Sequence, residues 1–181
     1  MTATWRTSIF AGASGADGAF YHTCQQRDGE PVWLELSCIH WAILSSVWGV
    51  PMPEFSVRTR KKQEMVDITE RVADLVTQSG VSDGICLVYV PHATAAVAIN
   101  ENADPNVCED ILDALANVIP EGRWRHDRID NNAAAHIKAT ILGPGQTVPV
   151  RGSRLRLGTW QSLMLVELDG PRERTVIVEV R

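Results

Sequence analysis

Three histidines in the second part of the chain have the side chains and positions that acid–base or metal chemistry would use. His92 follows an apolar run and Pro91, His126 lies in the polar segment RWRHD, and His136 follows three alanines. A neutral imidazole can ligate a metal or move a proton near neutral pH. No two of the three are four residues apart, the spacing that places two ligands on one helical turn. The spacing therefore leaves open whether they share a site or are unrelated.

Carboxylates near these histidines are the second set of candidates. Glu101 ends an apolar strand that starts just after His92. If this strand forms a hairpin with the preceding one, His92 and Glu101 lie at opposite ends of it. A crossover connection or a contact between subunits would then be needed to bring the two side chains together. Asp110 borders the buried stripe of a helix and is either solvated or aimed at a site. The remaining acidic candidates have local alternatives, a helix cap or a place in a charged loop: Asp104, Asp127 and Asp130.

The segment GTWQS, residues 158–162, interrupts the apolar run LRLGTWQSLMLVEL, which predicts a single buried strand. A glycine weakens a strand unless it forms a bulge or permits a close approach. Trp160 and Gln161 can both hydrogen-bond, and each needs a partner if it is buried. The segment is therefore either a kink in the strand or one wall of a site.

Several other classes of site lack their motifs. GPGQ is a turn, without the glycine and lysine pattern of a phosphate-binding loop, and no serine has a nucleophile-elbow context. The four cysteines show no CxxC spacing: Cys24, Cys38, Cys86 and Cys108. Cys86 and Cys108 fall in strand and helix patterns, which favours buried free thiols and a reducing, cytoplasmic setting.

Composition limits the class of protein and its partners. The 181 residues are 45% hydrophobic and 22% charged, as in a soluble globular protein, and the net charge is −5. That charge argues against nucleic acid and anionic membranes as partners. The early apolar run CIHWAILSSVWGV is too short to span a bilayer, and no targeting segment is evident.

Residues 1–53 and 54–181 differ in character. The first part holds four of the six tryptophans and no lysine, lacks sustained periodicity, and ends at Pro51-Met52-Pro53. It is interpreted as a poorly ordered extension or an upstream stretch wrongly included in the reading frame. The alternative is a lineage-specific segment in which WLELSCIHWAIL packs onto the domain or a neighbouring subunit.

The second part alternates strand and helix patterns with turn signals. Helices are expected from Thr69 to before Gly80, from the cap Asp104 to before Pro120, and over AAAHIKATIL. The first has its apolar residues Val72, Leu75 and Val76 on one face, and Pro105 suits the first turn of the second. ICLVYV reads as a strand covered on both faces, and the last strands follow one another through tight turns. A core stripe is expected on the middle helix at Val107, Ile111, Leu115 and Val118. The predicted class is α+β, with a largely antiparallel sheet or sandwich and about three helices.

At four segments the chain resembles the YjbQ family, also called UPF0047 and later "secondary thiamine-phosphate synthase enzyme". The segments are PHATAAVAINENADPNVCEDI, RWRHD, NNAAAHIKATILG and LGTWQSLMLVELDGPR, and the resemblance covers residues 54–181. Any one of them alone is a weak signal, and together they are specific. The family has two threonines after the first histidine, where this chain has Ala93-Thr94, which puts substrate contacts there in doubt.

The resemblance implies a compact α+β fold, a homotrimer, and sites in clefts near subunit contacts lined by the three histidines. It also implies a modest thiamine-phosphate synthase activity, which joins hydroxymethylpyrimidine diphosphate to thiazole phosphate and releases pyrophosphate. The expected catalytic residues are His92, Glu101, Asp110, His126 and His136. The expected substrate-binding residues are Thr94, Asn132, Thr159, Trp160 and Gln161.

Three functions follow as hypotheses. The first is the synthase, in which His92, His126 and His136 contact a divalent metal (Mg²⁺ or Zn²⁺) or phosphate and no organic cofactor is needed. The second is a non-catalytic trimer that holds a metal or an anion, and the third is a metal-assisted hydrolase of phosphorylated metabolites. The expected small-molecule partner is a phosphorylated heterocycle or another anionic metabolite.

Overall fold

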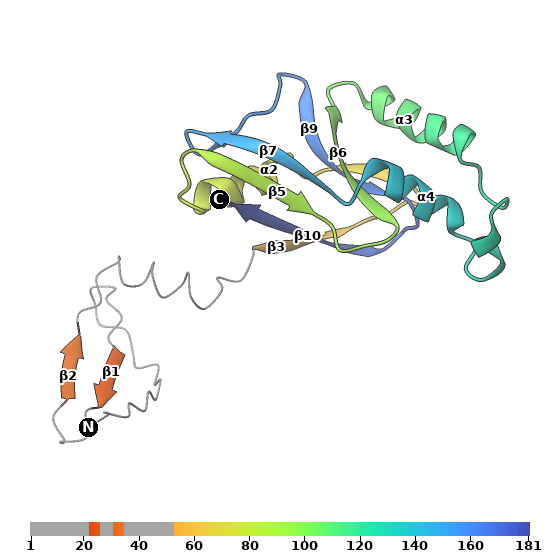
Figure 1. Ribbon diagram of the computed structural model, residues 1–181. Coiled ribbons are helices and arrows are strands. Elements are labelled where there is room, and N and C mark those ends of the chain that lie inside the picture. The colour runs from red at the N-terminus through yellow and green to blue at the C-terminus, as the bar shows by residue number, and fades with distance from the viewer. Residues whose placement is uncertain (1–21, 26–30, 35–52) are drawn as a thin grey trace. The chain divides into compact units, whose positions relative to one another are not determined.

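The structure, a computed structural model, describes residues 22–25, 31–34 and 53–181 (Figure 1). The chain divides into two compact units, Met1–Pro51 and Met52–Arg181. In the first unit β1 (His22–Gln25) and β2 (Pro31–Leu34) pair in antiparallel fashion. The two interpretations of residues 1–53 fall largely outside the described residues and stay predictions.

The second unit contains two antiparallel sheets. The larger has the strand order β3 (Glu54–Arg58), β10 (Glu173–Val180), β5 (Gly84–Tyr89), β7 (Gly145–Arg151) and β8 (Arg154–Leu155). The smaller has the order β4 (Glu64–Asp67), β9 (Gln161–Glu167) and β6 (Ala95–Glu101). With its helices this is an α+β fold, and the predicted class is confirmed.

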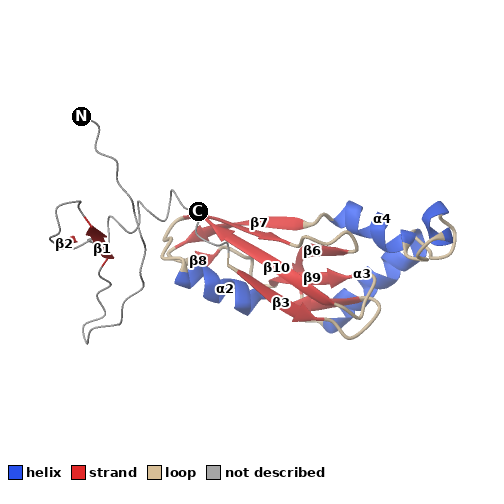
Figure 2. Ribbon diagram, turned by 90° about the horizontal axis from the view of Figure 1, so that it is seen from below, coloured by secondary structure: helices blue, strands red, loops and turns tan. Residues whose placement is uncertain are grey.

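The main core lies between these sheets and includes α2 (Thr69–Gln78), whose Val72 and Val76 are fully buried. It is built almost entirely of aliphatic side chains from the inward faces of the strands. Figure 2 shows α2 near the end of the unit where β7 and β8 lie, away from the other two helices. The helix therefore completes the core rather than covering an outer face.

A second, smaller core lies on the outer face of the three-stranded sheet. There α4 (Ala133–Leu142) and α3 (Pro105–Val118) add a helical layer, seen beside β6 and β9 in Figure 1. Ala135 and Ala139 of α4 pack on Ala96 and Val166 of the sheet. Because these alanines are small, α4 can lie close to the sheet and hold its side chains in fixed positions.

The strand ICLVYV does not have both faces covered by the part of the chain that the structure describes, so that expectation is wrong for this part of the single chain. Cys86 and Val88 point into the core, whereas Ile85, Leu87 and Tyr89 are 54%, 38% and 39% exposed. Alternation of side chains along a strand produces this division. The outer face of β5 is therefore an exposed apolar row.

The predicted start of α3 agrees with the structure, whereas the predicted core stripe of this helix agrees only in part. Asp104 Oδ1 accepts a hydrogen bond of 2.9 Å from Asn106 N, and Pro105 occupies the first turn, as predicted. Val118, placed in the expected stripe, is instead 78% exposed. No residue of α3 is fully buried, because the helix lies on the sheet with a half-buried side and its last turn is open to solvent.

The run LRLGTWQSLMLVEL is not one strand: it begins at Leu155, the last residue of β8, and contains β9. β8 belongs to the five-stranded sheet and β9 to the three-stranded sheet, so residues 156–160 cross from one sheet to the other. Among the described residues, no helix has the length and apolarity to cross a lipid bilayer.

Candidate functional site

The strongest candidate site is the cleft that contains His126 and His136. The short 3₁₀ helix η1 (Arg125–Arg128) carries His126, and α4 carries His136. The two imidazole rings meet edge to face, with centroids 5.2 Å apart and an interplanar angle of 84°. They open into a cleft of about 520 Å³ lined by Trp124, Arg125, His126, Ala133, His136 and Ile137.

A single carboxylate positions both walls of this cleft. Asp127 Oδ1 accepts a hydrogen bond of 3.0 Å from Ala133 N at the start of α4, and Oδ2 accepts one of 2.8 Å from Trp124 N. Asp127 is thus a cap for α4 rather than a partner of the adjacent His126. The carboxylate that lies near His126 is that of Asp130, 3.7 Å from Nε2.

The indole of Trp124 is held in place at the mouth of the cleft. Its Nε1–H donates to the carbonyl of Pro120 at 2.7 Å, while 37% of the residue stays exposed. An indole fixed through its N–H offers its ring face for stacking on a flat ligand. Arg125 also lines the cleft, whose wall is mostly apolar. The cleft therefore combines an aromatic surface, two imidazole rings and an arginine at its wall.

His92 is placed differently from the other two histidines. Its Nε2 accepts a hydrogen bond of 2.8 Å from Thr175 N, which requires that nitrogen to be unprotonated. Burial lowers the pKa of His92, and the nearby Arg174 guanidinium lowers it further. His92 is therefore a neutral ring committed to the backbone of β10.

The three histidines expected to form a metal site do not converge within one chain. In the parts of the chain that the structure describes, no group of three or more His, Cys, Asp or Glu side chains is arranged to hold a metal ion. His126 and His136 form a pair, and His92 lies apart with its Nε2 occupied. Metal binding stays a prediction without an assembled ligand set.

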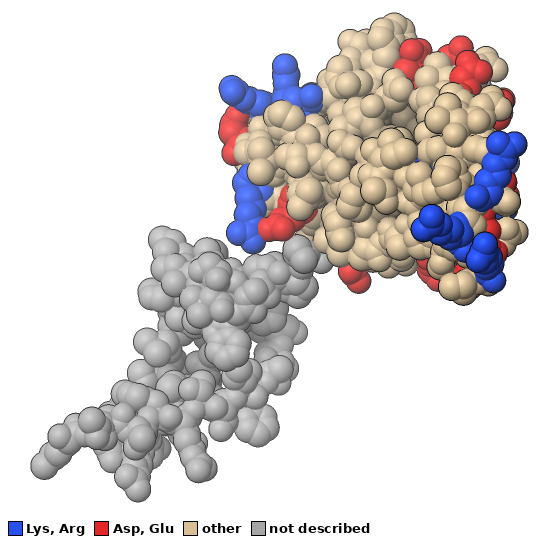
Figure 3. Space-filling model, turned by 45° about the vertical axis from the view of Figure 1, so that its right-hand side comes forward, with Lys and Arg blue, Asp and Glu red and all other residues tan. Residues whose placement is uncertain are grey.

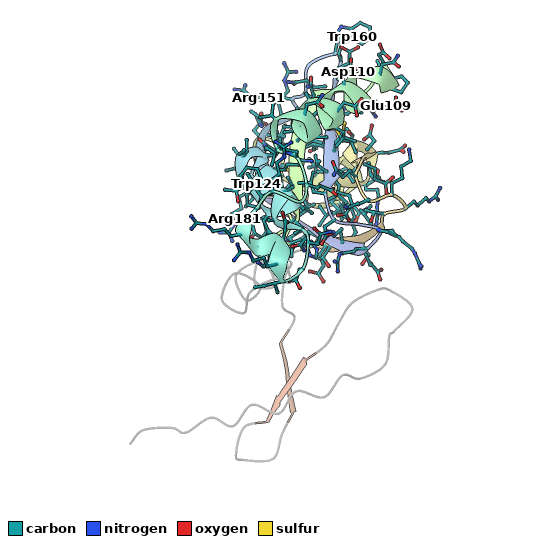
Figure 4. The ribbon with its side chains drawn as sticks, turned by 90° about the vertical axis from the view of Figure 1, so that its right-hand side faces the viewer. Glu109, Asp110, Trp124, Arg151, Trp160 and Arg181 are labelled. Atoms are coloured by element: carbon teal, nitrogen blue, oxygen red, sulfur yellow. The ribbon has the colours of Figure 1, made fainter. Side chains whose placement is uncertain are left out.

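Another group of predicted residues lies at one end of the smaller sheet. Glu101 is in register with Gln161, at the opposite end of β6 from His92, and a strand of this length spans roughly 20 Å. Gln161 Oε1 accepts from Gly158 N at 2.8 Å, so this amide closes the turn that contains Thr159. Trp160 is 65% exposed and lies at the same end of the molecule as Asp110 of α3 (Figure 4).

Thr94, predicted to bind substrate, is buried beside an ion pair that the sequence analysis missed. Arg174 donates through Nε to Glu167 Oε2 at 2.8 Å and through Nη2 to Thr94 Oγ1 at 3.0 Å. Thr59 Oγ1 also donates to Glu167, at 3.0 Å. Burial alone would raise the pKa of Glu167, but its hydrogen bonds to Arg174 and neighbouring groups outweigh burial and lower it. The buried carboxylate is thus ionised and fully paired.

This ion pair connects to the start of α4 through one turn of the chain. Glu167 Oε1 accepts from Asp169 N at 2.9 Å, and Asp169 Oδ2 accepts from Asn132 Nδ2 at 3.0 Å. Asn132 Oδ1 is buried and has no hydrogen-bond partner among the described residues. Asn132, another predicted substrate contact, therefore anchors the helix that carries His136.

The missed residues had one usable signal in the sequence. Glu167 interrupts an otherwise apolar strand, and a buried carboxylate requires a partner. Arg174 lies on the next strand, but nothing in its spacing identifies it as that partner. Lys138 was also missed: it is buried on α4, donates to Gln63 Oε1 at 3.2 Å, and has a pKa lowered by burial.

The two cysteines in the described region carry no reactive thiol. Cys86 is fully buried, as expected, and burial raises its pKa to about 11. Cys108 is half-buried rather than buried, and burial also raises its pKa, with the nearby Asp67 carboxylate acting in the same direction. Neither thiol forms an activated nucleophile.

Comparison with known proteins identifies relatives of the second unit. The sequence model of a family described as "UPF0047 protein YjbQ-like" matches residues 53–181. A UPF0047 protein of Archaeoglobus fulgidus is 46% identical over 127 residues, covering 70% of this chain and 98% of that protein. The UPF0047 protein YugU of Bacillus subtilis is 42% identical over 127 residues, covering 68% of this chain and 94% of that protein.

Solved structures share the fold as well as the sequence. A YjbQ/UPF0047 family protein from Clostridium acetobutylicum is 44% identical, with a TM-score of 0.69 over 71% of this chain and 99% of that one. A hypothetical protein from Aeropyrum pernix is 43% identical, also with a TM-score of 0.69, over 73% of this chain and 98% of that one.

Proposed function

The chain belongs to the UPF0047 protein YjbQ-like family, and from that premise we propose that it acts on a small phosphorylated heterocycle in the cleft at His126 and His136. The observation that carries the proposal is the composition of that cleft. One space is lined by a fixed indole, by Arg125 and by two imidazoles in edge-to-face contact. These groups match the ring, the phosphate charge and the proton transfers of such a ligand.

The specific reaction we propose is the synthesis of thiamine phosphate, with subunits assembled as a trimer. The thiazole nitrogen forms a bond to the methylene carbon of the pyrimidine, the carbon–oxygen bond to the diphosphate breaks, and pyrophosphate leaves. Negative charge grows on the leaving group, and fixed positive groups stabilise it most effectively. Arg125 supplies positive charge and the imidazoles of His126 and His136 supply hydrogen bonds, while Trp124 stacks on a ring.

The test is turnover by the purified full chain with hydroxymethylpyrimidine diphosphate and thiazole phosphate, measured as pyrophosphate release. His136→Gln removes the titratable group and keeps a polar side chain of similar size, so we expect kcat/KM to fall about 100-fold. Thr140→Gln, on an exposed position of the same helix, is the matched control and keeps its activity. Equal activity of His136→Gln and wild type would sink the proposal.

A second function, non-catalytic anion binding, is favoured by the openness of the cleft. The His126 side chain is 42% exposed, whereas a cationic pyrimidine intermediate must be protected from water. Calorimetry with pyrophosphate separates the two functions. A protein that binds pyrophosphate through His136 but releases none from the two substrates is a binding module.

A further inference from the structure

We infer that the turn from the end of β3 to the start of β4 is a contact surface for a short acidic segment of a partner protein. This basic turn, residues 58–63, holds four basic residues and no acidic one: Arg58, Arg60, Lys61 and Lys62. The whole chain has a net charge of −5, so the basic turn is a local reversal of its charge. None of these residues lines the cleft at His136, and the inference is independent of the proposed function.

Hydrogen bonds to the turn between β9 and β10 hold the basic turn in one conformation. Thr59 N donates to the carbonyl of Arg172 at 2.9 Å, and Arg172 N donates to Thr59 Oγ1 at 2.7 Å. Gly170 N donates to the carbonyl of Lys62 at 2.9 Å. A Cβ at Gly170 would lie 2.5 Å from the carbonyl oxygen of Lys61, so the close approach of the two turns requires glycine. A surface fixed in this way loses little conformational freedom when a partner binds.

Part of the positive charge of the basic turn is not neutralised by the chain itself. Three of its side chains are exposed and form no hydrogen bond or ion pair with another described residue: Arg58, Arg60 and Lys61. Lys62 pairs with Glu121, and Arg172 of the neighbouring turn pairs with Asp169. Glu64 Oε1 accepts two backbone N–H groups of the turn, so this carboxylate closes the turn rather than pairing with a basic side chain.

The size and composition of the surface favour an acidic peptide over nucleic acid. Duplex DNA carries one charge per roughly 1.7 Å along its axis, so beyond the two turns it would meet a chain of net negative charge. Single strands bind through aromatic rings on which bases stack, and residues 58–63 and 169–172 contain no aromatic residue. A few consecutive carboxylates match the three unpaired side chains, and each guanidinium can accept a carboxylate through two parallel hydrogen bonds.

The experiment uses the purified full chain and a fluorescently labelled hexaglutamate peptide, with binding measured by fluorescence anisotropy. The wild type should bind the peptide saturably at 50 mM NaCl and more weakly at 200 mM, because salt screens exposed charges. Replacing two of the unpaired residues together, Arg60→Gln with Lys61→Gln, should weaken binding at least tenfold. Both substitutions keep the backbone N–H groups that Glu64 accepts, so the turn should still close.

The matched control is Arg154→Gln with Arg156→Gln, which removes the same charge from two exposed residues. Arg154 lies on β8, at the opposite edge of the five-stranded sheet from β3, and Arg156 follows that strand. The control should bind the peptide as the wild type does. Equal weakening in the two double variants would show that only the net charge matters, and this would overturn the inference.

Three further outcomes also overturn it. The first is the absence of saturable hexaglutamate binding to the wild type. The second is loss of peptide binding in His136→Gln, which would place the peptide in the cleft rather than on the basic turn. The third is tighter binding of a short single-stranded RNA than of the peptide, lost in Arg60→Gln with Lys61→Gln, which would assign the basic turn to nucleic acid.

Discussion

Histidines that look alike in the sequence have different chemical roles because their surroundings differ. His126 and His136 share an open cleft and contact each other, whereas the Nε2 of His92 is occupied by Thr175 N. Arg174, close to His92, disfavours a second positive charge there. The Nε2 of His92 is therefore not available to a ligand, and His92 is expected to affect stability.

The position of His92 gives a prediction on the pH dependence of stability. Its pKa is lowered in the folded protein, so between that value and the unfolded value of about 6.5 the unfolded chain binds more protons. Its contribution to the free energy of unfolding is complete above pH ~6.5 and is lost as the pH falls towards the folded pKa. We expect urea midpoints of the wild type to fall over this range.

The comparison that isolates His92 is His92→Gln, whose side-chain oxygen can accept the same hydrogen bond without titrating. The difference in unfolding free energy between wild type and His92→Gln should shrink or reverse below pH ~6.5. Parallel curves for the two proteins from pH 7 to pH 5 would show that His92 does not titrate in this way.

At the scale of elements, the Glu167–Arg174 pair joins the two sheets. Glu167 ends β9 of the three-stranded sheet, and Arg174 lies on β10 of the five-stranded sheet. The same carboxylate accepts the backbone N–H of Asp169, whose side chain holds Asn132 before α4. This buried ion pair therefore links the two sheets to each other and, through Asp169 and Asn132, to the start of the helix that carries His136.

We predict that Arg174→Met lowers the free energy of unfolding by about 3–5 kcal/mol, because it leaves the Glu167 carboxylate buried without its partner. The control is Arg172→Met, which breaks the half-exposed pair with Asp169 and should cost about 0–1 kcal/mol. Chemical denaturation measures both. If the two substitutions cost the same, the buried pair does not join the sheets in the manner described.

The cap of α4 gives a second prediction at this scale. Asp127→Ala removes the acceptor for both Ala133 N and Trp124 N, so we expect a loss of about 0.5–2 kcal/mol and weaker ligand binding in the cleft. Asp113→Ala, which removes an exposed carboxylate on α3, is the matched control. Pyrophosphate binding measured by calorimetry should fall for Asp127→Ala only.

Local signals in the sequence identified most elements but not how they associate. Asp104 and Pro105 marked the start of α3, and the pattern of Val72 and Val76 marked the buried face of α2, because both depend on neighbours along the chain. The division of LRLGTWQSLMLVEL between two sheets depends on which strands pair across space, and no local pattern encodes that.

The candidate site was predictable only in part for the same reason. RWRHD and NNAAAHIK contributed His126 and His136, whose contact requires η1 to fold back on α4 through Asp127. The resemblance grouped His92 with them because it compares positions along the chain. His92 differs from the other two because its Nε2 accepts a hydrogen bond from Thr175, which is 83 residues away in the sequence.

At the scale of the second unit, the three layers leave the outer face of one sheet without a cover among the described residues. On the face that Figure 3 presents, charged side chains of this unit lie mainly at the margins. Ile85, Leu87 and Tyr89 lie in an exposed apolar row on the outer face of β5. Exposed apolar areas of this kind mark contacts between proteins. We therefore place a subunit contact of the proposed trimer on the outer face of β5.

The corresponding prediction concerns oligomeric state. Leu87→Glu places a charge at the centre of the β5 row while leaving the core-facing Cys86 and Val88 untouched, so the subunits should still fold. Burying that charge at an interface without a partner costs several kcal/mol. We expect the mass measured by light scattering to fall from that of a trimer to that of a monomer.

The control for this experiment is Val118→Glu, which places the same charge on an exposed apolar residue of α3 in the helical layer. It should leave the mass unchanged if the subunits meet through β5. A trimer that persists in Leu87→Glu but dissociates in Val118→Glu would place the contact on the helical layer instead.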